Sequence, residues 1–271
     1  MQTRIDRIEG TVMPVNSYVI ESAAGLVLVD GMLTKSDARA VRRHIDERKK
    51  PILGAIVTHA HPDHYAGLGE VLAGLDVPIA ATASVRRVIE RDDAIKNQIV
   101  GPMMGDEWPA TRVFPNRDVE SGSALALADL KLTVRDLGPG ESPADSLWSL
   151  DERTVFVGDL VYSGMHAYLA DGHLKEWLAC LDRLDAELDR DATLYVGHGA
   201  PAGKSLIEAQ RRYVHAFADA VARHLSREPT QRRAAVVADM RRFLPTEALL
   251  FLMELSVDPV AASLGAQDLA R

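Results

Sequence analysis

The sequence predicts an α/β protein, because short apolar runs of strand length alternate along the chain with segments of helical periodicity. With 271 residues, the chain is long enough to bury a full hydrophobic core. Hydrophobic residues make up 47% and charged residues 26%, a balance typical of globular proteins. There is no short repeat and no low-complexity linker, so we expect the elements to pack together.

The first elements are predicted to be a hairpin, a helix and a buried strand. Val12–Ile20 and Gly25–Val29 pair as the hairpin. Thr34 resembles an N-cap, with an acidic residue three positions later and apolar residues at helical spacing beyond it. Ile52–Val57 is a buried-strand run that leads directly into a cluster of histidines.

After the histidines we expect a helix over Leu68–Leu75, a short strand over Pro78–Ala81 and a helix over Ser84–Ala94. Lys96–Arg117 differs, because glycines and prolines are scattered among methionines and aromatic residues. This composition predicts a long irregular segment. Such a segment is either a lid or substrate wall, or a packed surface loop.

The second half continues the alternation. Lys175–Leu188 is predicted to be a helix, and the chain from Lys204 onward is helical, with Pro229 and Pro245 dividing it into about three helices. We therefore expect a catalytic domain over residues 1–203 and a helical C-terminal extension over residues 204–271. Four runs are predicted to be strands: Leu130–Val134, Leu147–Leu150, Thr154–Val157 and Thr193–Val196.

Charge and composition limit the kinds of molecule that this protein is expected to bind and the compartment in which it is expected to occur. The net charge of −8, from 39 acidic and 31 basic residues, argues against a broad nucleic-acid surface. No run approaches the ~18 apolar residues that cross a bilayer, and the N-terminus lacks a signal-like apolar stretch. The single cysteine, Cys180, fits a reducing compartment. We expect a cytoplasmic protein with a small-molecule substrate and neither nucleic acid nor membrane as partner; a homodimer stays open.

The strongest chemical signal is the run His59-Ala60-His61-Pro62-Asp63-His64, which directly follows a predicted buried strand. An isolated histidine is usually a core or surface residue, but four donors on one turn need another explanation. Imidazole and carboxylate groups together are typical ligands of Zn²⁺ and related ions. His59 and His61 can point one way, with Asp63 and His64 on the turn beyond, so the run can serve two adjacent ions.

Three further donors follow strand-like runs: Glu141, Asp159 and His198. Loops after successive strands converge at one edge of an α/β sheet, so these donors are expected near the histidine run.

Together these residues resemble the metallo-β-lactamase-fold hydrolase superfamily, from about Ile5 to about Gly203. The resemblance implies a four-layer αββα sandwich with helices outside two packed sheets and the metal site at one edge. It rests on the His59–His64 run and on four shorter motifs: Asn16-Ser17-Tyr18, Val29-Asp30-Gly31, Val157-Gly158-Asp159 and Gly197-His198-Gly199.

The resemblance also implies two divalent metal ions. His59, His61 and a third ligand would hold one ion, while Asp63, His64 and His198 would hold the other, and Asp159 would bridge them. A hydroxide between ions ~3.5–4 Å apart would be the nucleophile. Asp63 would also exchange a proton as a general acid–base.

One position departs from the family pattern. Glu141, in Pro139-Gly140-Glu141-Ser142, stands where the family usually has the third histidine of the first metal. Glutamate can ligate through oxygen, and we expect it to do so; the alternative is that it points to solvent and the first site is weak. Two divalent ions, three carboxylates and a hydroxide sum to zero charge. Zinc is the expected metal, but this charge balance favours Mn²⁺ or Fe²⁺ more than an all-histidine set would.

Tyr162 is a second catalytic candidate, since in the lactonase branch of the family a tyrosine three residues after the bridging aspartate donates to the substrate carbonyl. Its alternative is an ordinary core aromatic. His166 could contact substrate or be a plain loop histidine, and Asp145-Ser146 is expected to order its loop.

We therefore expect hydrolysis of an ester, lactone, thioester or β-lactam in a small, partly hydrophobic molecule. The Lys96–Arg117 segment and the C-terminal helices are expected to wall the pocket. Two rivals remain: an iron-dependent redox member of the same fold, and a non-catalytic metal-binding or scaffold protein.

Overall fold

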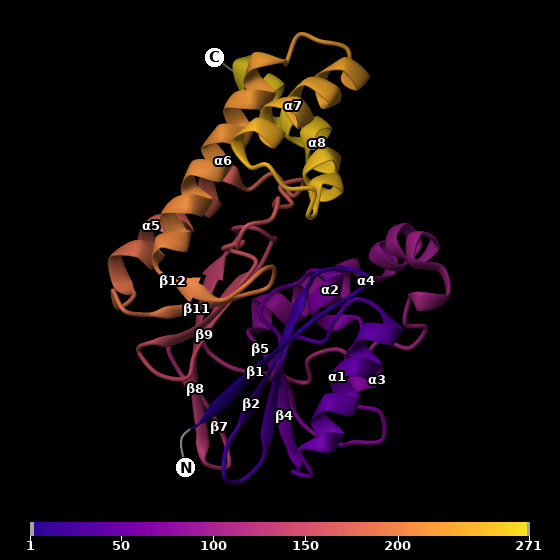
Figure 1. The fold of residues 1–271 in the computed structure, drawn as a ribbon, viewed down its shortest axis with the longest axis vertical. Coiled ribbons are helices and arrows are strands. Elements are labelled where there is room, and N and C mark those ends of the chain that lie inside the picture. Colours follow the sequence, from indigo (N-terminus) through magenta and orange to yellow (C-terminus); the bar gives the residue numbers. More distant parts are fainter. Residues whose placement is uncertain (1–2, 270–271) are drawn as a thin grey trace.

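Two six-stranded sheets pack against each other at the centre of the computed structural model, which describes residues 3–269, and helices cover the outer face of each sheet (Figure 1). This arrangement confirms the predicted αββα sandwich. The first sheet has the strand order β1 (Arg4–Glu9), β2 (Asn16–Glu21), β3 (Leu26–Val29), β4 (Ile52–Ile56), β5 (Ile79–Ala81) and β6 (Arg117–Asp118). The second has the order β12 (Ala202–Gly203), β11 (Thr193–Val196), β10 (Thr154–Gly158), β9 (Asp145–Ser149), β8 (Leu130–Gly138) and β7 (Ala124–Leu127).

Successive side chains of a strand point to opposite faces of its sheet, so neighbouring apolar residues of one strand belong to different hydrophobic cores. Val27 and Val29 of β3 face the second sheet and meet Trp148 and Phe156 there. Leu26 and Leu28 of the same strand face the helices of the first sheet. Because β3 is buried on both faces, it is apolar at every position, whereas a half-exposed strand would alternate.

Helices cover both sheets. The first sheet carries α1 (Lys35–Glu47), α3 (Leu68–Val71) and α4 (Ala83–Met104), and the second carries α5 (Leu174–Glu187) and α6 (Ser205–Arg223). Thr34 caps α1 as predicted, since its side chain accepts the backbone N–H of Asp37. Two short helices, α2 (Pro62–Tyr65) and the 3₁₀ helix η1 (Gly105–Glu107), complete this half.

The C-terminal helices lie above the sandwich, where α7 (Pro229–Phe243) and α8 (Leu250–Leu269) pack on α6 (Figure 1). This confirms the three helices expected after Lys204. Met240 and Met253 belong to the same apolar core as Val155 and Leu194 of the second sheet. The boundary at residue 203 stays a prediction.

Two parts of the sequence prediction were wrong. The segment after Lys96 is not irregular throughout, because α4 continues to Met104. Pro102 lies in the last turn, where it removes one i→i−4 hydrogen bond but no further turn has to follow, and Trp108 packs beside Gly101 and donates to Asn97 at 2.7 Å. The strands β1, β6, β7 and β12 were not predicted. They are edge or short strands with partly exposed residues, which weakens their apolar signal.

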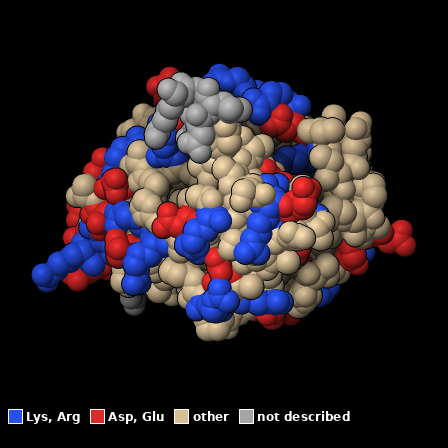
Figure 2. Space-filling view, turned by 90° about the horizontal axis from the view of Figure 1, so that it is seen from above, with Lys and Arg blue, Asp and Glu red and all other residues tan. Residues whose placement is uncertain are grey.

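Smaller differences concern element ends. The first hairpin strand begins at Asn16 rather than Val12, and α3 ends at Val71. Among the described residues, no helix has the length and hydropathy needed to cross a bilayer. On the face seen from above the C-terminal helices, basic and acidic residues are intermixed (Figure 2).

Candidate metal centre

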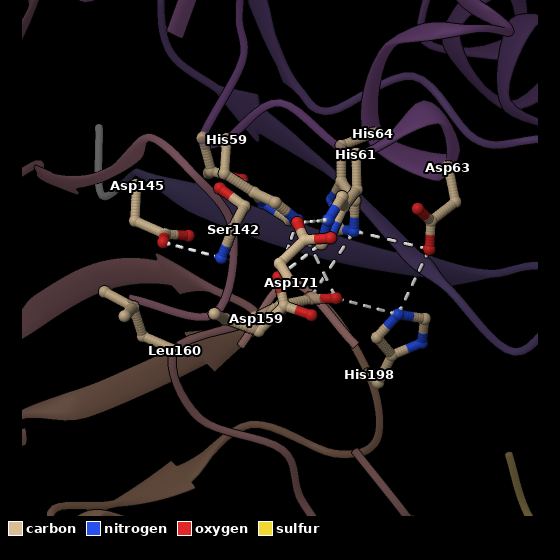
Figure 3. A network of polar contacts seen from close by, with 12 residues as sticks. His59, His61, Asp63, His64, Ser142, Asp145, Asp159, Leu160, Asp171 and His198 are labelled. Carbon is tan, nitrogen blue, oxygen red and sulfur yellow. Dashed lines mark hydrogen bonds and ion pairs between the residues drawn. The ribbon is translucent and has the colours of Figure 1, made fainter. Parts of the chain in front are cut away.

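Seven donor side chains converge at one edge of the sandwich, and each is predicted from the sequence; Figure 3 labels all of them except Glu141. They come from the loop after β4, from α2, and from the loops after β8, β10 and β11. All seven residues are buried, with at most 7% of their surface exposed: His59, His61, Asp63, His64, Glu141, Asp159 and His198.

The donors form two clusters that share Asp159. In each cluster, one donor atom per residue lies within 4.8 Å of the others. His61 Nδ1 lies 2.9 Å from Glu141 Oε2 in the first cluster, and His198 Nε2 lies 3.1 Å from Asp159 Oδ2 in the second. The first cluster is His59, His61, Glu141 and Asp159, and the second is Asp63, His64, Asp159 and His198. Each therefore offers two imidazole nitrogens and two carboxylates.

Five inward-facing atoms of these clusters form no hydrogen bond, although two of them, Glu141 Oε2 and His198 Nε2, lie in the ion-pair contacts given above. A buried polar atom without a partner costs about 1–3 kcal/mol, so native proteins rarely leave several together. Here five such atoms point toward the same small volume: His59 Nε2, His64 Nε2, Glu141 Oε2, Asp159 Oδ1 and His198 Nε2. Their number, chemistry and spacing fit two divalent cations, because cation ligation would satisfy all of them.

Each histidine ring also makes a polar contact through the nitrogen that faces away from the clusters. Such contacts fix the ring orientation and the tautomer of a metal-binding histidine. The partners and distances are Thr58 Oγ1 to His59 Nδ1 at 3.0 Å, Asp171 Oδ2 to His61 Nε2 at 2.9 Å, Asp30 Oδ2 to His64 Nδ1 at 2.9 Å and Pro14 O to His198 Nδ1 at 2.6 Å. Consequently His61 presents Nδ1 to its cluster, whereas the other three present Nε2.

These supporting residues were not identified from the sequence. Asp30 was named only as part of a strand-end motif, and its position directly after a buried strand is the one signal that pointed to it. Asp171 lies 110 residues from His61 in a loop without a distinctive pattern. Pro14 contributes a backbone carbonyl, which carries no sequence signal.

Gly197, which directly follows β11, allows the backbone at this position to lie close to Asp159, the residue that belongs to both clusters. A Cβ at this position would lie 1.8 Å from Asp159 Oδ1 and 2.7 Å from the ring of His64. Any side chain would therefore displace two donors of the second cluster, which explains why glycine precedes His198.

Burial and mutual charge perturb the ionisation of the cluster. Burial raises the pKa of Glu141 to about 7, although the neighbouring His61 opposes the shift. Burial lowers the pKa of His198, but the charges of Asp159 and Asp63 outweigh burial and raise its pKa to about 10. Burial and the adjacent His64 hold the pKa of His59 well below its usual value. Protons thus balance the carboxylate charge in part, and bound cations would displace them.

Tyr162 lies directly over the clusters. Its hydroxyl donates to Asp159 Oδ2 at 2.9 Å and contacts Glu141 Oε1 at 3.1 Å, and its ring stacks on His198. Burial and the adjacent carboxylates raise its pKa well above the usual value, so the phenol stays protonated and able to donate.

The other candidates have structural contacts. His166 bonds to the Tyr213 hydroxyl at 2.8 Å and lies near the Thr246 carbonyl, and it does not line the cavity above the clusters. Asp145 accepts the Ser142 backbone N–H at 2.9 Å and so orders the loop that carries Glu141, as expected.

A cavity of about 200 Å³ opens above the two clusters. Its floor includes Asp63, Glu141, Asp159, Tyr162 and His198, and its walls come from α4 and α8. The expectation that the segment after Lys96 and the C-terminal helices border the site is therefore correct, although the wall is a helix.

Comparison with known proteins identifies the family of this chain. The model of the metallo-β-lactamase superfamily matches residues 10–198, so the chain belongs to that superfamily. A type 2 metallo-β-lactamase of Bacillus sp. (strain 170) is 22% identical over 76% of this chain and 75% of its own length. A hydroxyacylglutathione hydrolase of Methylobacterium nodulans is 27% identical over 76% of this chain and 86% of its own.

Two further matches differ in extent. A 66-residue stretch is 38% identical to an (R)-specific secondary-alkylsulfatase of a Pseudomonas species and spans only 10% of that protein. The crystal structure of a metallo-β-lactamase family protein from Thermus thermophilus superimposes with a TM-score of 0.70 and 21% identity, covering 97% of this chain and 94% of that one. The structural likeness supports the fold, including the C-terminal helices.

Proposed function

We propose that this protein is a dinuclear metal-dependent hydrolase that cleaves a carbonyl-centred bond in a small molecule. The observation that carries the proposal is the pair of clusters sharing Asp159, with five buried donor atoms that form no hydrogen bond. The superfamily includes relatives named for β-lactam and hydroxyacylglutathione hydrolysis, so an ester, lactone, thioester or β-lactam is the proposed bond.

His59, His61 and Glu141 would hold one ion, and Asp63, His64 and His198 the other, with Asp159 between them. A pair of divalent ions supplies Lewis acidity for the carbonyl oxygen and lowers the pKa of a water molecule toward neutrality. Zinc is the first candidate. Because each cluster has two nitrogen and two carboxylate ligands, Mn²⁺ and Fe²⁺ also suit it.

The side chains of the cavity floor would supply the remaining steps. Asp63 lies at the open side of the second cluster and lines the cavity, so it is placed to take a proton from the attacking water and return it to the leaving group. Tyr162 also lines the cavity and stays protonated, so its hydroxyl would turn from Asp159 and donate to the oxygen that gains charge in the transition state.

The test combines metal analysis with a substrate panel. Gently purified protein should contain two metal ions per chain and hydrolyse at least one member of a panel of esters, lactones, thioesters and β-lactams. Asp159→Ala should lose both metals and at least 10³-fold in kcat/KM. The matched control is Asp93→Asn, since Asp93 is a buried carboxylate that pairs with Arg112 outside the clusters.

Three results would contradict the proposal. Oxygen consumption with iron in the site, in place of hydrolysis, would identify the redox rival. Two bound metals without turnover of any panel member would favour a non-catalytic metal-binding role. Unchanged activity in Asp159→Ala would remove the clusters from the mechanism.

A further inference from the structure

The walls of the cavity are hydrocarbon, although its floor is polar. From α4 come Ile99, Val100, Met103 and Met104, and from α8 come Phe251, Leu252 and Leu255. Among the described side chains of α4 and α8, Lys96 is the one charged group in the lining. A purely polar substrate would leave this surface without complementary contacts.

The mouth of the cavity gathers exposed apolar side chains. Ile99 is 56% exposed, Met103 57%, Phe251 48% and Leu255 54%. They are four of the eight large hydrophobic residues that are exposed in the described part of the chain, and they lie on the two helices that border the opening. Contiguous exposed apolar surface beside a site marks a surface that is covered by a ligand or partner.

Resting on the proposed function, we infer that the substrate carries a hydrocarbon group that lies between α4 and α8. The walls are continuous with the floor that holds Glu141, Asp159 and His198, so one molecule can occupy both. A group on the walls places its attached carbonyl at the floor. Apolar cavities of ~150 Å³ hold a benzene molecule, so 200 Å³ accommodates about six to eight carbon atoms.

The size of the cavity predicts a dependence on chain length. Complete burial of one methylene corresponds to about fourfold in binding. With 4-nitrophenyl esters from acetate to dodecanoate, kcat/KM should rise two- to fourfold per methylene to about eight carbons. It should then level off, because further atoms reach only the exposed mouth.

A matched pair of variants on one helix assigns this dependence to the cavity. Ile99 lines the opening, whereas Ile95 lies one turn earlier on α4, is 50% exposed and does not line the cavity. Ile99→Gln should lower the ratio of octanoate to acetate kcat/KM by about three- to tenfold. Ile95→Gln should leave the ratio and both activities as in the unchanged protein.

Calorimetric titration with 1-octanol and 1-butanol separates this inference from the proposed function, because the alcohols contain no scissile bond. Octanol should bind at least tenfold more tightly than butanol. Ile99→Gln should weaken the binding of octanol more than Ile95→Gln does. If octanol binds in this way but no ester is cleaved, the inference of a hydrocarbon-binding cavity stands, whereas the proposed hydrolysis of an ester bond is contradicted.

The inference is overturned if cleavage proceeds without dependence on chain length, or if the two alcohols bind alike. It is equally overturned if Ile95→Gln and Ile99→Gln have the same effect on the ratio. A dimer that Ile99→Gln dissociates, together with flat chain-length dependence, would assign the apolar mouth to a second copy of the chain.

Discussion

Asp30 allows a quantitative test of how the fold supports the centre, since it joins β3, the β4 strand end and α2. Its carboxylate accepts three hydrogen bonds, from Thr58 N at 2.9 Å, Thr58 Oγ1 at 2.8 Å and His64 Nδ1 at 2.9 Å. The residue is 3% exposed and has a φ of 59°, in the left-handed region that asparagine and aspartate adopt more readily than alanine.

Two substitutions separate these contributions. Asp30→Ala leaves the Thr58 N–H and the His64 N–H as buried donors without an acceptor, at about 1–3 kcal/mol each. It also places a Cβ residue with no compensating hydrogen bond at positive φ, which costs about 1 kcal/mol. The expected loss in the free energy of unfolding is therefore about 3–7 kcal/mol. Asp30→Asn keeps the left-handed conformation and one acceptor oxygen, so the expected loss in the free energy of unfolding is only about 1–2 kcal/mol.

Urea unfolding in the presence of a chelator measures this loss for the metal-free protein. A separate metal titration should show a 10–100-fold weaker second site in Asp30→Asn, because His64 loses its charged support. Asp118→Ala is the control, as Asp118 is an exposed strand-end aspartate, and should change stability by less than about 1 kcal/mol. The reasoning is refuted if Asp30→Ala costs under 1 kcal/mol, or if alanine and asparagine behave alike.

Three further outcomes follow from single residues. Gly197→Ala should reduce metal content below one ion per chain in elemental analysis, since its Cβ would overlap Asp159; full occupancy would disprove the clash. Burial raises the pKa of the Cys180 thiol, so alkylation by iodoacetamide should be slow in the native protein and fast in urea; equal rates would show that the thiol is exposed. Burial raises the pKa of Asp6, but His44, Arg4 and Arg48 lower it more, so the net shift is downward. Its stabilising effect, roughly 0.5–1 kcal/mol, is present above about pH 4 and lost as the pH falls. The stability difference between the unchanged protein and Asp6→Asn should therefore vanish between pH 5 and pH 2, and a constant difference would contradict this sign.

Much of the fold was predictable because the buried strands are apolar on both faces and the long helices carry apolar residues at helical spacing. β4, β5 and β10 were predicted nearly to the residue for this reason, and β11 was predicted from its alternation of buried and half-buried residues. The prediction failed where the signal is weak, as in the half-exposed β1, or misleading, as at Pro102 inside the last turn of α4. Proline removes a backbone hydrogen bond anywhere beyond the first turn of a helix, but in the last turn the distortion does not interrupt a helix that continues.

By itself, the sequence determined which side chains carry the chemistry. Histidines and acidic residues at the ends of apolar runs are costly to bury without a partner, so their positions alone indicated a metal centre. The resemblance implied that Glu141 joins His59 and His61 and that Asp159 serves both sites, and the structure brings these side chains together. Only the tertiary structure decided that the cavity wall after Lys96 is a helix, and which groups support each histidine ring. Pro14 supports His198 from 184 residues away. Such contacts depend on the packing of two sheets and on backbone groups, and neither leaves a pattern in the local sequence.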